Sequence, residues 1–407
     1  MKSAIVYLAQ NTRKDPQYGR DSRSMLEKSL DLLYENYNHK FKHPVLIFHE
    51  GDFGPADQEA VIAGRDEIEF HEVHFDVPSF LRKEEVPEFW QSQTGRSRFG
   101  MGHRHMYRFY SLLLFDILAD LGYEWYMRLD DDSFVHSRIG YNLFEFMEKN
   151  DYEYGYRVDV QEGLSASYGF GETVLAYIKS ERIDPAFFYK HVKEITTNDI
   201  ARRRIKEFLL KIDPEGKFHN VRENNLSPVA REPYDRRGYY NNFHITRIAF
   251  WKRPEVQYFL HHMDRVGAAY KYRWGDLLIQ SAAVQIFMPK GKVYKFEDWT
   301  YEHATIIGGK LKYGGIYHGT QDKDAKVVKA FRERYGAEHL DASTFTHREI
   351  VLFPQFHRWR STWVRRAEMA WKAVHGEPIA KWPMLLRTLW LGRRSRQHMD
   401  AAGQDQS

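Results

Sequence analysis

Three segments near the N-terminus change their hydrophobic spacing in the order strand, helix, strand. Residues 5–8 form a short apolar run, which is typical of a buried strand. Residues 22–38 repeat apolar side chains at helical spacing, and residues 43–51 form a second apolar run that ends at Gly51. The apolar face of the predicted helix consists of Met25, Leu26, Leu30, Leu33 and Tyr37. Because parallel strands need a long crossover connection, this order predicts an α/β fold with a parallel sheet.

A second predicted helix and strand lead into three consecutive aspartates. Residues 101–123 repeat Met106, Phe109, Leu113 and Ile117 at helical spacing, and residues 125–129 alternate in the manner of a strand. The segment 130–132 that follows reads Asp-Asp-Asp. In open α/β sheets ligands bind at the carboxyl ends of the strands, so the aspartates are predicted to lie at a binding edge.

Three adjacent carboxylates repel one another unless a cation or protons compensate. Alternation along a strand predicts that Asp130 and Asp132 share one side and that Asp131 points to the other. This geometry suits one hard divalent ion, Mn²⁺ or Mg²⁺. The competing interpretation is a solvated acidic turn that caps the next element. An EF-hand is excluded because its central glycine and final glutamate are missing.

The chain of 407 residues contains no cysteine, which excludes disulfides, thiolate metal sites and cysteine nucleophiles. A metal must therefore be held by oxygen or imidazole. The N-terminal apolar run is too short to span a bilayer and lacks a cleavage site of small residues, and no other stretch reaches the roughly 20 apolar residues of a spanning helix. We therefore expect a cytoplasmic protein with neither a signal peptide nor a transmembrane helix.

The C-terminal segment differs from the rest of the chain. Residues 358–396 contain ten Lys and Arg against two Glu, and five of the ten Trp. A basic, Trp-rich amphipathic helix suits an anionic membrane surface, although a helical pair packed on the domain has the same pattern. Nucleic acid is not expected as a partner, because no DNA-binding pattern accompanies the charge. Residues 195–238 are polar and turn-rich, and predict a long loop or insertion.

Several stretches in succession resemble the fungal α-1,2-mannosyltransferase family. They read HKFKHPVLIFHEGDF, GHRHMYRFYS, YEWYMRLDDDSFV, YEYGY, YNNFHITRIAFW, YKYRWGDLLIQSAAVQIFMPK and DWTYEHA. The sequence Arg-Trp-Gly-Asp at 273–276 is especially close to the family form. The resemblance covers roughly residues 3–310 and leaves the C-terminal tail unexplained.

The resemblance implies a GT-A glycosyltransferase fold, that is, a Rossmann-like mixed sheet flanked by helices. It also implies GDP-mannose as donor, a glycan or glycolipid acceptor, Mn²⁺ as cofactor with Mg²⁺ as the second choice, and transfer with retention. On this basis we expect a catalytic domain over residues 1–345, interrupted by the 195–238 insertion, and a helical tail over residues 346–407.

The family's metal-strand pattern of Arg, hydrophobic, Glu, Pro and Asp reads Arg-Leu-Asp-Asp-Asp at 128–132. Carboxylates remain at both outer positions, and His303 matches a family histidine, so the resemblance implies metal binding by Asp130, Asp132 and His303. A lone histidine is more often structural than a ligand, which is the competing interpretation. The residues implied at the donor are His103, Arg104, His105, Arg128, Asp130 and Arg273; helix capping or surface ion pairs are the alternatives for Arg104 and His105.

The largest departure from the family concerns catalysis. The family carries Glu in an Asn-Phe-Glu-Ile stretch as its candidate nucleophile, and here that position is His244. A histidine is a poor glycosyl nucleophile, because retaining double displacement uses a carboxylate. Asp276 is the first alternative carboxylate, although its place before an apolar helix also fits a helix N-cap. We expect Asp276 and His244 beside the sugar and acceptor.

The sequence therefore predicts a retaining, metal-dependent mannosyltransferase that forms an α-1,2 linkage. Two alternatives stay open. One is a carbohydrate-binding protein that kept the fold and lost turnover, which His244 favours. The other is the same fold with a different nucleotide-sugar.

Overall fold

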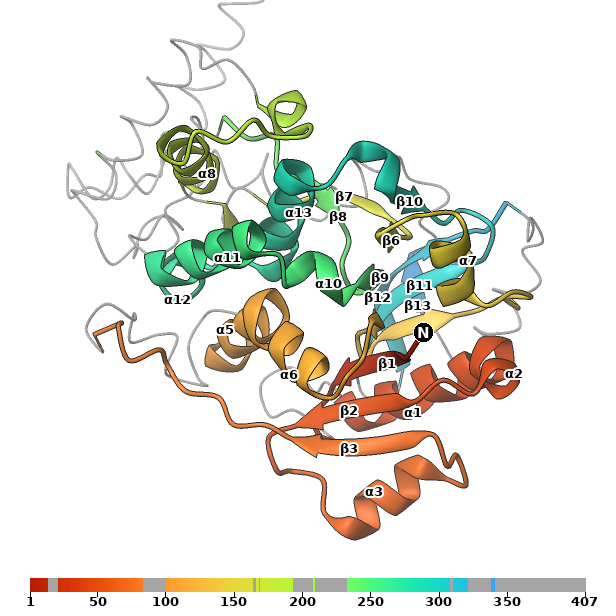
Figure 1. Cartoon of the computed structure of the whole chain (residues 1–407). Helices are drawn as coiled ribbons and strands as arrows, with labels where there is room; N and C mark the ends of the chain where they lie inside the picture. The colour runs from red at the N-terminus through yellow and green to blue at the C-terminus, as the bar shows by residue number, and fades with distance from the viewer. Residues whose placement is uncertain are drawn as a thin grey trace, which may run out of the picture.

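The structure of the chain is a computed structural model. It describes residues 1–13, 21–82, 100–163, 166–167, 169–192, 208, 233–307, 310–320 and 338–340. The chain enters the fold through β1 (Ser3–Leu8), a central strand of the larger sheet (Figure 1). The predicted loop at 195–238 and the predicted tail at 346–407 lie largely or wholly outside the described residues.

A seven-stranded mixed sheet forms the centre of the molecule, in the order β10-β6-β9-β4-β1-β2-β3. β1 pairs in parallel with β2 and with β4, whereas β9 is antiparallel to both β4 and β6. Besides β1, its strands are β2 (Val45–His49), β3 (Ile68–Glu72), β4 (Trp125–Leu129), β6 (Tyr154–Tyr156), β9 (Phe243–Arg247) and β10 (Val293–Lys295). The strands predicted at 5–8 and 125–129 are therefore confirmed, and both lie in the middle of the sheet.

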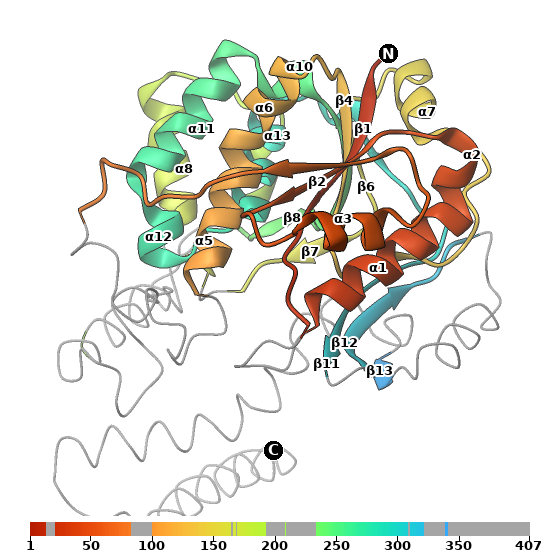
Figure 2. The same cartoon turned by 90° about the horizontal axis from the view of Figure 1, so that it is seen from below.

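Helices cover both faces of this sheet, as Figure 2 shows from below. One face carries α5 (Met101–Arg108), α6 (Leu114–Asp120), α8 (Phe170–Ser180), α10 (Ile248–Trp251), α11 (Pro254–Val266), α12 (Ala268–Tyr272) and α13 (Asp276–Phe287). The other carries α1 (Ser22–Leu33), α2 (His39–Phe41) and α7 (Leu143–Lys149), while α3 (Pro55–Ile62) follows β2. Successive side chains of β1 point to opposite faces of the sheet. Val6 therefore packs in the core under α6 and α11, and Tyr7 packs in the core under α1.

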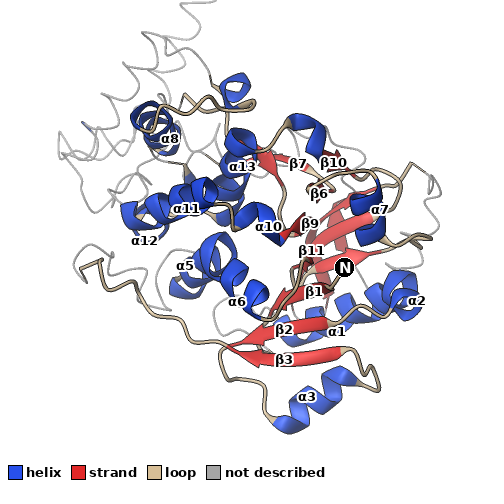
Figure 3. Cartoon of the chain, in the orientation of Figure 1, coloured by secondary structure: helices blue, strands red, loops and turns tan. Residues whose placement is uncertain are grey.

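A smaller sheet, in the order β13-β12-β11-β5, stands beside the larger one (Figure 3). Its strands are β5 (Ser133–Val135), β11 (Tyr301–Ile307), β12 (Lys310–Tyr317) and β13 (Glu338–Leu340). A further pair joins β7 (Asp159–Gln161) to β8 (Arg237–Tyr239). Because β5 begins directly after the three aspartates, its antiparallel pairing with β11 brings a distant part of the chain to them.

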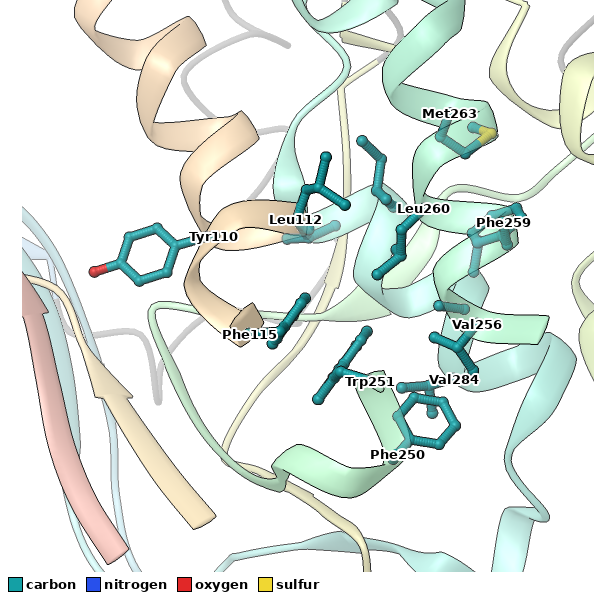
Figure 4. Packing of buried hydrophobic residues seen from close by; sticks show 14 of the residues in the cluster. Tyr110, Leu112, Phe115, Phe250, Trp251, Val256, Phe259, Leu260, Met263 and Val284 are labelled. Carbon is teal, nitrogen blue, oxygen red and sulfur yellow. The ribbon is translucent and has the colours of Figure 1, made fainter. Parts of the chain in front are cut away.

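The core between the sheet and α11 is rich in aromatic side chains (Figure 4). Phe115 of α6 stacks flat on Trp251 of α10, with ring centroids 4.5 Å apart. Tyr110 lies in a π-helical segment, Phe109–Leu113, which joins α5 to α6. This segment has a wider turn than an α-helix, so it changes the phase of the apolar stripe. As a result Met106, Leu113 and Ile117 are only partly buried, and only Phe109 of the predicted stripe is fully buried.

The fold prediction is otherwise confirmed at the level of class and layers. The helical face predicted over residues 22–38 is buried at all five of its apolar positions. The helix there ends at Leu33 and continues as a π-helical segment, Tyr34–Asn38. Within the described residues, every helix is too short or too polar to cross a membrane.

Candidate active site

The three aspartates form a turn at the carboxyl end of β4. The strand ends at Leu129, the Asp130 backbone N–H donates to the Asn242 carbonyl at 3.1 Å, and the Ser133 N–H donates back to the Asp130 carbonyl at 3.0 Å. This turn, rather than the strand alternation assumed from the sequence, groups the side chains of Asp130 and Asp132 on one site.

His303 completes the cluster from β11. The register of β11 against β5 places His303 opposite Ser133, one residue after Asp132. The Nε2 atom of His303 lies 2.9 Å from Oδ1 of Asp132, and its Nδ1 atom lies 3.0 Å from the Tyr240 hydroxyl. One ligand atom from each of Asp130, Asp132 and His303 lies within 4.8 Å of the others. The three residues predicted to bind metal are therefore brought together.

The chemistry of this cluster fits a divalent ion. Two carboxylates and an imidazole are ligands that Mn²⁺ accepts. Because Nδ1 of His303 already contacts Tyr240, Nε2 is the nitrogen that would bind the metal. Burial raises the pKa of Asp130, and the Asp132 charge raises it further, against the opposing effects of Arg128 and His303. A bound cation stabilises the ionised form of such a carboxylate.

Arg128, on β4, joins this cluster to a second carboxylate. Its Nε donates to Oδ1 of Asp130 at 2.8 Å, and its Nη1 donates to Oδ2 of Asp276. The guanidinium also lies over the Tyr110 ring, 3.4 Å from the centroid. Burial opposes the charge on Arg128, but Asp130 and Asp276 outweigh that effect and raise its pKa. Arg128 therefore remains charged and holds the two carboxylates in a fixed relation.

Asp276 is the first residue of α13, and Gly275 occupies the N-cap position. No side chain caps this helix end, so the capping interpretation of Asp276 is wrong. Its Oδ2 accepts instead from Arg128 and, at 2.8 Å, from the amide of Asn241. The carboxylate is 4% exposed, so it is held in a nearly dry place beside the acidic cluster.

His244, on β9, is buried completely. Its Nε2 atom lies 2.7 Å from the Tyr126 hydroxyl, and its Nδ1 atom lies 3.0 Å from the Asn241 carbonyl. Its ring also stacks on Tyr154, with centroids 5.5 Å apart. Burial lowers the pKa of His244 to about 3, with help from the Arg128 charge and against the hydrogen bond to Asn241. The imidazole is therefore neutral near pH 7 and both of its nitrogens are engaged.

Two of the predicted donor residues, Arg104 and Arg273, come together around Tyr107. The Arg104 guanidinium lies 5.7 Å from the Tyr107 ring centroid, and burial lowers the pKa of Arg104 to about 9, with Arg273 adding to the effect against Tyr107. Arg273 ends α12 in the left-handed region, with φ at 66°. The buried guanidinium of Arg104 and the partly buried one of Arg273 in one place favour an anionic ligand.

The two predicted donor histidines lie on the same helix, α5, in different surroundings. The His103 ring meets the Tyr107 ring edge-on at 6.5 Å between centroids. His105 lies 3.1 Å from the Tyr270 hydroxyl and stacks on Phe75. His103 is therefore grouped with the arginines, whereas His105 packs toward α12.

Sequence reasoning missed three polar residues of the site. Asn241 holds Asp276, Tyr240 contacts His303, and Tyr110 lies under Arg128. Tyr240 and Asn241 begin the stretch YNNFHITRIAFW, which resembles the family. Their position in that stretch could have identified them as site residues. Tyr110 carried no signal, because a tyrosine in an apolar helix usually belongs to the core.

A separate cavity of about 490 Å³ lies between α8, α11 and the segment before α13. Tyr177, Tyr272 and Trp274 contribute aromatic side chains to its lining. Two of its lining residues, Tyr272 and Trp274, flank Arg273 in the chain.

The mixed sheet with an acidic group at its edge defines a GT-A-like glycosyltransferase fold. Core-mannan synthase A from Aspergillus fumigatus, solved in an Mn/GDP form, superposes with a TM-score of 0.56 at 17% identity over 74% of each chain. The mannosyltransferase Ktr4p from S. cerevisiae, solved in complex with GDP, gives a TM-score of 0.56 at 19% identity, covering 75% of this chain and 72% of Ktr4p.

The chain belongs to the glycolipid 2-alpha-mannosyltransferase family, whose sequence profile matches residues 20–310. Glycolipid 2-alpha-mannosyltransferase 2 from Candida albicans is 23% identical over 312 residues, and glycolipid 2-alpha-mannosyltransferase from Saccharomyces cerevisiae is 24% identical over 286 residues. These alignments cover 74% and 68% of this chain. They span only 60% and 57% of the two relatives.

Proposed function

We propose that this protein transfers mannose from GDP-mannose to a mannoside of a glycan or glycolipid, with retention and with formation of an α-1,2 linkage. The observation that carries the proposal is the grouping of Asp130, Asp132 and His303 within 4.8 Å at the binding edge of the sheet, in a chain of the mannosyltransferase family. The related fold of core-mannan synthase A has been solved with Mn and GDP.

In this proposal Asp130, Asp132 and His303 hold Mn²⁺, with Mg²⁺ as the second choice. The bound ion offsets the charge of the nucleoside diphosphate leaving group. Arg128 keeps Asp130 in place, so that the ligand carboxylate does not turn away from the ion. The donor's negative charge is met by further residues on α5 and at the end of α12, namely His103, Arg104, His105 and Arg273.

At the sugar end we propose Asp276 as the catalytic carboxylate that faces the mannose or the acceptor hydroxyl. It is the carboxylate that Arg128 links to the acidic cluster. His244 stands next to it in the hydrogen-bonded network and supports it. A neutral imidazole with both nitrogens engaged is not a nucleophile, so retention in this chain proceeds without a covalent bond at residue 244.

The test is release of GDP from GDP-mannose in the presence of Mn²⁺ and methyl α-mannoside, with product linkage read by NMR. Asp132→Asn serves as the inactive control. We expect GDP release that depends on both the metal and the acceptor. Absence of transfer across a panel of mannosides would defeat the enzymatic proposal.

A second candidate is a carbohydrate-binding protein without turnover. The observation that favours it is His244 at the position where the family carries a carboxylate, buried and engaged at both nitrogens. Calorimetry distinguishes the two: binding of GDP-mannose or a mannoside with no GDP release supports the binding protein.

The identity of the donor needs its own measurement. Binding of GDP-mannose, GDP-fucose and UDP-glucose is compared in Mn²⁺ at equal concentrations. We expect GDP-mannose to bind most tightly, because the chain belongs to a mannosyltransferase family and the mannosyltransferase Ktr4p was solved in complex with GDP. A preference for UDP-glucose would overturn the donor.

The basic tail is proposed to bind an anionic membrane surface. Its charge and its tryptophans support this role, and the segment lies outside the described residues. Deletion of residues 351–407 is expected to abolish sedimentation with vesicles that contain phosphatidylserine while GDP release persists. Unfolding of the truncated protein would favour a packed helical pair instead.

Cell fractionation tests the cytoplasmic location that we predict from the cysteine-free sequence.

A further inference from the structure

Hydrogen bonds to the backbone and to the side chain of Asn241 connect the sheet interior to the proposed catalytic carboxylate. Tyr126 on β4 contacts His244 on β9 at 2.7 Å, and His244 contacts the Asn241 carbonyl at 3.0 Å. The amide of Asn241 then reaches Asp276 at 2.8 Å. All four residues are at most 5% exposed, so water competes little for these contacts.

The direction of each hydrogen bond follows from the groups involved. A backbone carbonyl only accepts, so the proton of His244 must lie on Nδ1 and be donated to Asn241. Because the pKa of His244 is lowered to about 3 by burial and by Arg128, the ring carries only that one proton. Its Nε2 is then an acceptor, and the Tyr126 hydroxyl donates to it.

Asn241, which His244 holds by its backbone carbonyl, contacts the Asp276 carboxylate with its side chain. Its Nδ2 donates to Oδ2 of Asp276 and also, at 3.2 Å, to Oε1 of Gln280. Gln280 is fixed in turn, because its own Nε2 donates to the Tyr110 carbonyl at 2.8 Å. Arg128 donates to the same oxygen of Asp276 as Asn241 does. Both donors therefore engage Oδ2, and Oδ1 is the oxygen that they leave for a substrate.

We infer that His244 is a positioning residue, which acts through the backbone of Asn241 to hold the Asp276 carboxylate with Oδ1 toward the substrate. The inference rests on the proposed function, in which Asp276 acts at the sugar. An ionised glutamate, which the family carries at this position, has no proton to donate to the Asn241 carbonyl. In this inference position 244 supports its neighbour and does not itself react with the sugar.

Two substitutions separate the two nitrogens of His244. In His244→Asn the side-chain amide nitrogen takes the place of Nδ1, and it can still donate to Asn241. In His244→Gln the amide nitrogen takes the place of Nε2, near Tyr126, and the donor to Asn241 is lost. Both replacements are neutral, polar and smaller than histidine, so each serves as the control for the other.

We expect kcat of H244Q to lie at least about tenfold below that of H244N, because supporting hydrogen bonds around a site carry effects of that size. Binding of Mn²⁺ and GDP, measured by calorimetry, is expected to be equal in the two variants, since Asp130, Asp132 and His303 are not altered. Equal kcat values for both variants, or losses that only follow their melting temperatures, would overturn the inference.

A second readout does not depend on transfer. In a crystal structure of H244Q, the Asp276 carboxylate is expected to have left Asn241, while in H244N it keeps that contact. Asp276 in the same position in both structures would overturn the positioning role. If the unaltered protein releases no GDP, the proposed function fails, and these two structures still decide whether His244 holds Asp276.

Discussion

The metal end and the sugar end of this site are built in different ways. At the metal end, Asp130 and His303 remain partly exposed, and the pairing of β5 with β11 brings their ligand atoms together. At the sugar end, Asp276 and His244 are buried, and their neighbours already occupy most of their polar atoms. We therefore expect the proposed metal end, Asp130, Asp132 and His303, to need an ion for its completion, whereas the hydrogen bonds of the proposed sugar end are already formed.

This difference indicates where the site tolerates change. Carboxylates that bind a cation keep their function only if they keep their charge. A buried network keeps its function as long as each donor faces an acceptor, so a residue can change type when its hydrogen bonds are replaced. We propose that the exchange at position 244 is of this second kind.

Replacement of the residue that joins the two ends has the largest expected effect. Arg128→Met removes the cation from Asp130 and Asp276 together and leaves two carboxylates close to each other. Loss of one partner from a buried ion pair costs about 3–5 kcal/mol. We expect the free energy of unfolding to fall by that amount in urea titrations without metal, and GDP release to be lost.

A matched control is available on the helices that cover the sheet. Arg108 forms a two-bond ion pair with Asp264, at 2.9 Å and 3.1 Å, away from the acidic cluster. Arg108→Met is expected to reduce stability by less, because this pair is partly exposed, and to leave binding of Mn²⁺ and GDP intact. Equal losses of stability in both variants would show that Arg128 is an ordinary structural arginine.

Loss of the proposed metal ligand Asp132 should distinguish the role of the metal end from that of the sugar end. Asp132→Asn removes a charge that faces His303 at 2.9 Å. We expect the rate of GDP release to fall by more than about 100-fold, beyond what a supporting contact contributes. Mn²⁺-dependent binding of GDP is expected to disappear in calorimetry. Asp151→Asn, on the exposed loop after α7, is the control for loss of a paired carboxylate outside the cluster, since Asp151 pairs with Lys292. Tight binding of Mn²⁺ to D132N would remove Asp132 from the ligand set.

Replacement of Asp276 at the sugar end should lower the rate of transfer without weakening the binding of metal and nucleotide. Asp276→Asn keeps the shape of the side chain and leaves Arg128 paired with Asp130. We expect kcat to fall by about 100-fold while binding of Mn²⁺ and GDP is retained, because the metal ligands are unchanged. A loss of nucleotide binding that matches the loss of kcat would place Asp276 at the donor instead.

The sequence predicted the metal end better than the sugar end, for a physical reason. Asp130 and Asp132 are neighbours in the chain, and a strand that precedes them already places both at a sheet edge. His303 was found only through the family resemblance, because the pairing of β5 with β11 joins residues that are far apart in sequence. The α/β class followed from the periodicity of the apolar residues, whereas the mixed sheet flanked by helices was implied by the family resemblance.

The sugar end depends on contacts that no local pattern encodes. The N-cap interpretation of Asp276 was reasonable for an acid before an apolar helix, but Arg128 and Asn241 both offer donors to it and Gly275 takes the cap position. The role of Asn241 follows from its long-range contact with Asp276. Likewise, α-helical periodicity predicted one buried face along residues 101–123. The π-helical segment Phe109–Leu113 changes that face, so Leu113 and Ile117 are only partly buried.

The smallest expected effect is a dependence of stability on pH that His244 carries. The pKa of His244 is lowered from 6.5 to about 3 in the folded protein, chiefly by burial and also by Arg128. Below pH 6.5 the unfolded chain therefore binds a proton that the folded one does not, and the free energy of unfolding falls as the pH falls toward 3, by up to about 1.4 kcal/mol per pH unit.

His244→Asn removes this titration and leaves His43, whose pKa burial also lowers, to about 4, in both proteins. The stability difference between H244N and the unaltered protein should therefore shrink by about 2 kcal/mol between pH 7 and pH 5 in metal-free urea titrations. Parallel curves over that range would mean that His244 is charged in the folded protein. It could then not accept a hydrogen bond from Tyr126, and the sugar end would not be ordered in the way its contacts indicate.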